Sequence, residues 1–151
     1  MKSDVVQLVL ALLALVTGAA LEELLPKALG VGFPLLLAAA VYAGARRRAA
    51  FALAFAAAAG AAEDALSALP LATSVSFFPL AAVAAMRLGR AVPVALVAYP
   101  CYQLWLWVWL ADLNGSVFLR VLASVPVMAL TAWAAFAALA RAERGAAADD
   151  D

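Results

Sequence analysis

Residues 49–70 of the chain read AAFALAFAAAAGAAEDALSALP. The stretch carries no charge before Glu63 and Asp64, about two-thirds of the way along it. A helix that crosses a bilayer needs about 20 mainly apolar residues, and a proline such as Pro70 interrupts helical hydrogen bonding. The spacing therefore predicts a membrane-spanning helix over 49–69.

Composition extends this prediction to the whole chain. Of 151 residues, 69% are hydrophobic and 13% are charged, whereas soluble domains are roughly half apolar and one-quarter charged. Six helices of about 20 residues use roughly 120 residues, which leaves no room for a domain outside the bilayer. We therefore predict an all-α integral membrane protein with six transmembrane helices in a single domain, residues 1–140, followed by a charged cytoplasmic tail, 141–151. The expected spans are 5–25, 32–45, 49–69, 71–86, 92–111 and 117–140.

The first span has an alternative interpretation. Gly18, Ala19 and Ala20 follow an apolar core, as small residues do at the cleavage site of a signal peptide. Asp4 weakens the positive start that such a peptide needs, and the core is long. A retained first helix is therefore favoured.

Basic residues predict the orientation, because short loops rich in Lys and Arg stay cytoplasmic. Ten such residues are present, and the six-span arrangement divides them eight to two. Both termini are therefore expected in the cytoplasm of a multi-pass protein. The inner eight are Lys2, Arg46, Arg47, Arg48, Arg87, Arg90, Arg141 and Arg144, and the outer two are Lys27 and Arg120.

Several chemistries are excluded by composition. The chain has no histidine and one cysteine, Cys101, so it has no internal disulfide, no histidine-based metal site and no Ser-His-Asp triad. It has no glycine-rich phosphate loop, and its zero net charge argues against nucleic acid. We expect no catalytic residue, no cofactor and no metal.

Two side-chain patterns suggest how the helices pack. Ala52, Ala56 and Gly60 recur every four residues and form a small-residue stripe, which suits packing inside the bundle or, alternatively, a partner's helix. Aromatic residues crowd the second half of the fifth span, where an interfacial belt is favoured over an aromatic ligand box. They are Tyr99, Tyr102, Trp105, Trp107 and Trp109.

The acidic pair allows several interpretations. Acidic residues inside a span are costly and usually functional, but Glu63 lies roughly 21 Å along its helix at 1.5 Å per residue, near the outer boundary. The helix could end near Ala62, with the pair capping a loop or opening a short helix over 63–69. A partner-binding or polar-network role is the main alternative, and proton-coupled transport is the least favoured.

The chain resembles the family of the rod shape-determining protein MreD. In that family a short second span ends in an aromatic and basic patch, as Val41–Arg48 does here, and the third ends in a pattern like G-x-x-[ED]-D-x-L-S-x-x-P-[LF]-G. Ala72 departs from the final glycine, and Leu35 from a polar residue often found after the proline that opens span two. The matching residues are Gly60, Asp64, Leu66, Ser67, Pro70 and Leu71.

The resemblance implies a non-enzymatic scaffold of the bacterial elongation machinery in the inner membrane. It would couple the bitopic protein MreC, the MreB filament and the cell-wall (peptidoglycan) synthases, with membrane lipids around it and a homodimer left open. The family fold is similar to the substrate-binding subunits of energy-coupling-factor transporters. On this interpretation the outer rim binds a partner through Gly60, Glu63, Asp64, Ser67, Pro70 and Leu71.

Two other function classes remain as alternatives. A substrate-binding subunit of a vitamin-type transporter needs polar residues that converge at one depth, and Gln103, Ser124 and Thr131 are the candidates. A membrane hydrolase needs two acids on separate helices, and only Asp64 and Asp112 lie at a similar outer depth. Neither pattern is evident in the sequence, so the scaffold is favoured.

Overall fold

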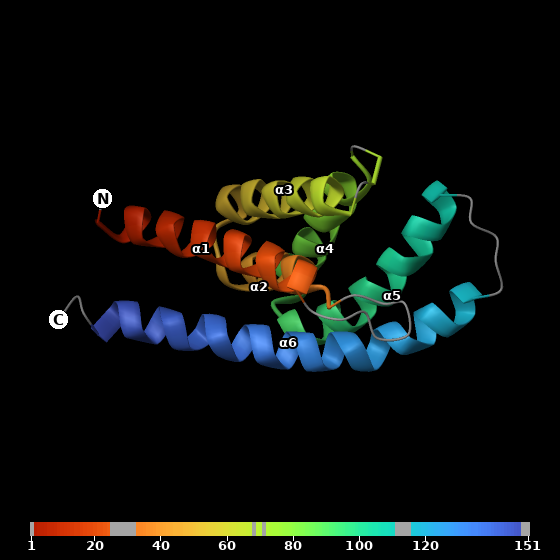
Figure 1. Ribbon diagram of the computed structural model, residues 1–151. Helices are drawn as coiled ribbons and strands as arrows, with labels where there is room; N and C mark the ends of the chain where they lie inside the picture. The colour runs from red at the N-terminus through yellow and green to blue at the C-terminus, as the bar shows by residue number, and fades with distance from the viewer. Residues whose placement is uncertain (1, 25–32, 68, 71, 111–115, 149–151) are drawn as a thin grey trace.

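The computed structural model describes residues 2–24, 33–67, 69–70, 72–110 and 116–148. Within these ranges the chain is all-helical, without a strand (Figure 1), so the predicted all-α class is confirmed there. The helices are α1 (Lys2–Leu24), α2 (Leu35–Arg46), α3 (Ala49–Leu66), α4 (Thr73–Leu88), α5 (Ala91–Leu110) and α6 (Ser116–Ala148).

Several helix bounds differ from the expected spans. α2 begins only at Leu35, after Pro34 at its N-cap position. α3 ends at Leu66 instead of at residue 69. α6 continues to Ala148, so residues 141–148 extend the last helix instead of forming a separate tail. Alanine and arginine are strong helix formers, which explains why the charged segment stays helical.

α2 is the central helix of the molecule. All its residues from Leu36 to Gly44 are buried, and it contacts α1, α3, α4, α5 and α6. Its 12 residues rise about 18 Å at 1.5 Å each, less than the roughly 30 Å of a hydrocarbon core. In the folded chain, α2 is surrounded by these other helices and not by lipid.

Small residues set the close approach of the helices. A Cβ atom on Gly44 of α2 would lie 2.3 Å from the carbonyl oxygen of Ala82 in α4, so only glycine fits there. In α3, Ala52 and Ala56 are fully buried and Gly60 is also buried. The predicted small-residue stripe therefore faces the interior of the bundle, and α3 packs against α2 and α4.

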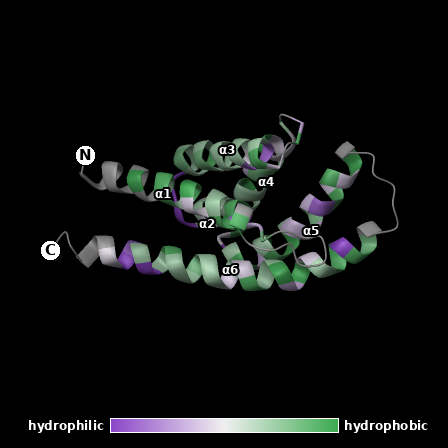
Figure 2. Cartoon of the chain, in the orientation of Figure 1, coloured by the Kyte–Doolittle hydropathy of each residue, from purple (hydrophilic) through white to green (hydrophobic). Residues whose placement is uncertain are grey.

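The outer surface of the helices is apolar. Among the described residues, three helices are long and apolar enough to cross a membrane: α3, α5 over Ala91–Val108, and α6 over Phe118–Gly145. Large hydrophobic side chains such as Val16, Val97 and Phe118 are well exposed. Figure 2 shows hydrophobic residues along most of the helices. An apolar exterior of this extent fits a membrane protein.

The start of α1 and the end of α6 lie at the same end of the molecule (Figure 1). Arg47, in the α2–α3 turn, forms a salt bridge of 2.7 Å with Glu143 of α6, and the hydroxyl of Tyr42 donates to the same carboxylate at 3.0 Å. Arg46 and Arg90 line one cavity beside the later part of α6. We call this region, with Arg46, Arg47 and Arg90, the basic end.

Gly44→Ala should destabilise the chain, because its new Cβ would meet the backbone of Ala82. Overpacking of this kind costs about 1–3 kcal/mol. Thermal unfolding of the full chain in detergent measures the effect as a lower Tm. The control is Gly145→Ala in α6, where the Cβ meets nothing within 4 Å and helix propensity gains up to about 1 kcal/mol. Equal Tm values for the two variants would contradict the close α2–α4 contact.

Candidate functional site

The predicted site residues lie where α3 ends and α4 begins. We call the last turns of α3, the link and the first turn of α4 the α3–α4 joint. Gly60, Glu63 and Asp64 belong to the last turns of α3, which ends at Leu66. The alternative in which the helix ends near Ala62 is therefore wrong. Ser67 follows the helix, and Pro70 lies in the link to α4. Leu71 lies outside the described residues.

Asp64 caps the N-terminus of α4. Its side chain is 1% exposed. Its Oδ1 accepts a hydrogen bond from the backbone N–H of Ser74 at 2.7 Å, and its Oδ2 accepts a longer one from Val75 at 3.4 Å. The N-cap residue, Ala72, makes no side-chain bond of its own. The carboxylate from α3 therefore satisfies first-turn donors that a local Ser or Asp usually satisfies, and its charge is stabilised there by the helix dipole.

Gly60 allows this cap to form. A Cβ atom at this position would lie 2.6 Å from the carbonyl oxygen of Ser74 and 2.7 Å from the nitrogen of Val75. Gly60 and Asp64 are four residues apart and so share one face of α3. The two residues act together. Gly60 lets the backbones of α3 and α4 come into contact, and Asp64, one turn further along α3, accepts hydrogen bonds from the backbone amides of α4.

Two aromatic residues of α5 hold the same turn of α4 from the other side. The hydroxyls of Tyr102 and Ser74 share a hydrogen bond of 2.5 Å, and the indole N–H of Trp105 donates to the carbonyl of Thr73 at 3.0 Å. The Thr73 hydroxyl donates to the carbonyl of Pro70 at 2.8 Å. The first turn of α4 is thereby fixed by α3, α5 and the preceding link.

These contacts revise the expectation of an interfacial aromatic belt. Tyr99 and Tyr102 are each only 3% exposed, so they belong to the core. The indole N–H of Trp107 is buried without a hydrogen-bond partner in the described part of the chain. The side chain of Trp109 lies outside the described residues.

Ala72 has a strained backbone. Its φ is 80°, in the left-handed region, and it is the only non-glycine residue with a positive φ in the described ranges. This conformation costs an L-residue roughly 1–2 kcal/mol, and glycine adopts it freely. The resembled MreD pattern has glycine at this position.

A second carboxylate caps a helix in the same way. Glu22, near the end of α1, accepts a hydrogen bond from the backbone N–H of Leu36 at 2.8 Å. α2 begins after Pro34, which has no side-chain acceptor. The carboxyl of Glu22 also interacts with that of Glu63, so the ends of α1 and α3 meet. Sequence reasoning missed this cap, because Glu22 and the amide of Leu36 are 14 residues apart in the chain.

The part of the joint that faces outward is small. The carboxylate of Glu63 accepts a hydrogen bond from the hydroxyl of Ser67 at 3.0 Å in an exposed position. Leu66 and Pro70 are also exposed. We call these four residues the rim. Of the predicted partner-binding residues, Glu63, Ser67 and Pro70 are thus accessible, whereas Gly60 and Asp64 are buried against α4.

Other polar groups do not converge on this site. The Ser124 hydroxyl donates to the carbonyl of Val121 at 2.6 Å, and the Thr131 hydroxyl to that of Val127 at 2.7 Å, both within α6. In the described ranges, no three Cys, Asp or Glu residues gather as metal ligands would. The joint can therefore fix helix positions and present a rim, but its buried acid is already bonded.

No family model, no curated protein and no solved structure matches the chain.

Asp64→Ala should destabilise the fold, because it leaves the buried amides of Ser74 and Val75 without their acceptor. The expected cost is about 1–3 kcal/mol, and Asp64→Asn should lose less, since it keeps an acceptor. Thermal unfolding of the full chain measures both. Glu63→Ala removes an equal charge from the adjacent, more exposed position and serves as the control. A loss for Glu63→Ala equal to that for Asp64→Ala would refute the capping role.

Ala72→Gly should stabilise the chain by about 1 kcal/mol, because it relieves the positive φ. The matched control is Ala58→Gly at an exposed position within α3, where glycine costs about 1 kcal/mol. The same unfolding assay should show shifts of opposite sign. A decrease in Tm for both variants would argue against the left-handed link.

Proposed function

We propose that the chain is a non-enzymatic scaffold of the bacterial cell-elongation machinery, as its resemblance to the MreD family suggests. The observation that carries the proposal is that the resembled pattern coincides with one structural unit. Gly60 makes the α3–α4 contact, Asp64 caps α4, and Ser67 and Pro70 belong to the rim. The final glycine of the pattern corresponds to Ala72 in this chain, and the φ of Ala72 is positive.

The proposed topology has six spans with both termini in the cytoplasm. The start of α1 and the end of α6 lie at the same end of the molecule, which supports an even number of crossings. The grouping of Arg46, Arg47 and Arg90 at that end supports a cytoplasmic assignment, because basic residues are retained on that side. α2 and α4 are short, and packing against the longer helices accounts for their presence in the bundle. The inner membrane of a bacterium is the proposed location.

The proposed partners follow from the rim and the apolar exterior. The membrane-proximal part of a bitopic MreC-like protein would contact the rim, and its spanning helix would lie against the exposed apolar faces. Through that protein the scaffold would couple MreB filaments to the cell-wall synthases. Gly60 and Asp64 would act indirectly, by setting the position of the rim. A homodimer through the same faces is a second arrangement.

A transporter subunit is the alternative function. It needs polar side chains that converge on a substrate, but the hydroxyls of Ser124 and Thr131 bond to their own helix. The buried hydroxyl of Ser74 is engaged by Tyr102. These contacts favour the scaffold. The identity of the neighbouring genes discriminates further, since a bitopic coiled-coil partner supports the scaffold and a pair of ATPases supports transport.

Co-purification tests the scaffold. The tagged full chain, co-expressed with the MreC-like protein of the same organism, should recover that protein from detergent extracts. Ser67→Arg places a long cation on the exposed rim and should lower recovery by about tenfold, equal to about 1.4 kcal/mol. Unfolding temperatures of the purified variant establish that the fold is retained.

The matched control is Gly145→Arg, which adds the same charge at the basic end, where no atom would meet its Cβ within 4 Å. It should recover the partner as the wild type does. Absence of the partner from wild-type preparations, or equal recovery with Ser67→Arg, would refute the proposed rim contact.

A further inference from the structure

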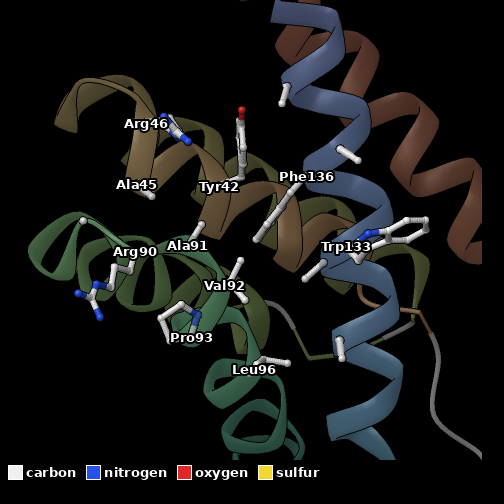
Figure 3. Close-up of a pocket in the computed structure, with 15 residues that line it drawn as sticks. Tyr42, Ala45, Arg46, Arg90, Ala91, Val92, Pro93, Leu96, Trp133 and Phe136 are labelled. Carbon is white, nitrogen blue, oxygen red and sulfur yellow. The ribbon is translucent and has the colours of Figure 1, made fainter.

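A cavity of about 810 Å³ opens at the basic end, between α2, α5 and α6. Figure 3 shows residues that line it: Tyr42 and Arg46 come from α2, Arg90 precedes α5, and Phe136 comes from α6. Its volume is in the range of small-molecule sites, which is roughly 300–1,000 Å³. None of the described residues of the α3–α4 joint lines it.

Two arginines are the charged side chains among the described residues that line this cavity. Arg46 and Arg90 are exposed, and no acidic residue is among the residues that line the cavity. The nearby carboxylate of Glu143 is already engaged by Arg47 and Tyr42. Within the described part of the chain, the cavity therefore has an excess of positive charge that suits an anionic group.

The rest of the lining is apolar and low in bulk. Alanines contribute along α6, including Ala132 and Ala137, and their short side chains leave the space open. Leu96 of α5 and Phe136 of α6 provide larger apolar surface, and Trp133, 74% exposed, stands at the edge. Such a wall suits hydrocarbon chains, because it offers them dispersion contacts without polar groups that would be desolvated.

We propose that this cavity binds one anionic phospholipid. The phosphate lies between Arg46 and Arg90, and an acyl chain runs along the apolar wall between α5 and α6. A free phosphate would leave the apolar wall unused, and a zwitterionic lipid would leave the excess positive charge uncompensated. This inference rests on the chain being embedded in a membrane, and it does not depend on the scaffold role.

The location agrees with this ligand. Basic pockets between membrane helices on the cytoplasmic side bind anionic head groups, and the proposed orientation places the basic end there. The cavity lies between the end of α2, the start of α5 and the later part of α6. A bound lipid would therefore hold the ends of α2 and α5 against α6 by contacts that the protein alone does not make.

Native mass spectrometry of the full chain in detergent tests the site. The probes are phosphatidylglycerol, phosphatidylcholine with the same acyl chains, and glycerophosphoglycerol, which has the head group alone. The wild type should bind phosphatidylglycerol preferentially. Arg46→Gln should weaken that binding about fivefold, and Arg46→Gln with Arg90→Gln about thirtyfold. Ala137→Leu fills the cavity without changing charge and should weaken both lipids.

The matched control is Arg48→Gln with Arg87→Gln, which removes two exposed arginines that do not line the cavity. Its affinity for phosphatidylglycerol should stay within twofold of the wild type. Equal loss in the control pair would show attraction by net charge alone and overturn the site. Equal binding of the two lipids, or of the head group and the intact lipid, would also overturn it.

Discussion

The hydrogen bonds from the first turn of α4 to the carboxylate of Asp64 are the constraint on which much of the packing depends. A helix that starts inside an apolar bundle has backbone N–H groups that neither water nor lipid can satisfy. One buried acid meets this need and is itself stabilised by those donors. The hydroxyl of Tyr102 and the indole of Trp105 then bond to the same turn, so α3, α4 and α5 are positioned by one polar cluster.

The same device recurs between α1 and α2. Glu22 accepts a hydrogen bond from a backbone N–H in the first turn of α2, as Asp64 does from the first turn of α4. Both acids lie near the end of a helix and cap the next one along the chain, whose own N-cap residue, Pro34 or Ala72, has no side-chain acceptor. An acid in such a place is less costly than it appears from composition, because its carboxyl oxygen replaces the acceptor of a local cap. The short α2 can therefore begin deep within the bundle.

The sequence predicts the helical class, the approximate positions of the helices and the polar character of the α3–α4 region, because hydrophobic length and the distribution of charge are local properties. It does not predict the role of Asp64 or Glu22, since each acid caps a helix ten or more residues away. The sequence also places Tyr102 at a membrane interface, because aromatic crowding does not reveal which face of a helix meets another helix. The cavity lined by Arg46 and Arg90 is formed by three helices together, so the sequence of no single helix predicts it.

The enclosure of α2 also bears on how the chain enters the bilayer during synthesis. A lone helix inserts because its apolar side chains move from water into lipid. The free energy gained in this way is limited for α2, because its 12 residues are too few to cross the hydrocarbon core. In the folded state its residues from Leu36 to Gly44 contact protein instead. The order of assembly is therefore constrained: α2 reaches its final environment only after α4, α5 and α6, all made later, have closed around it.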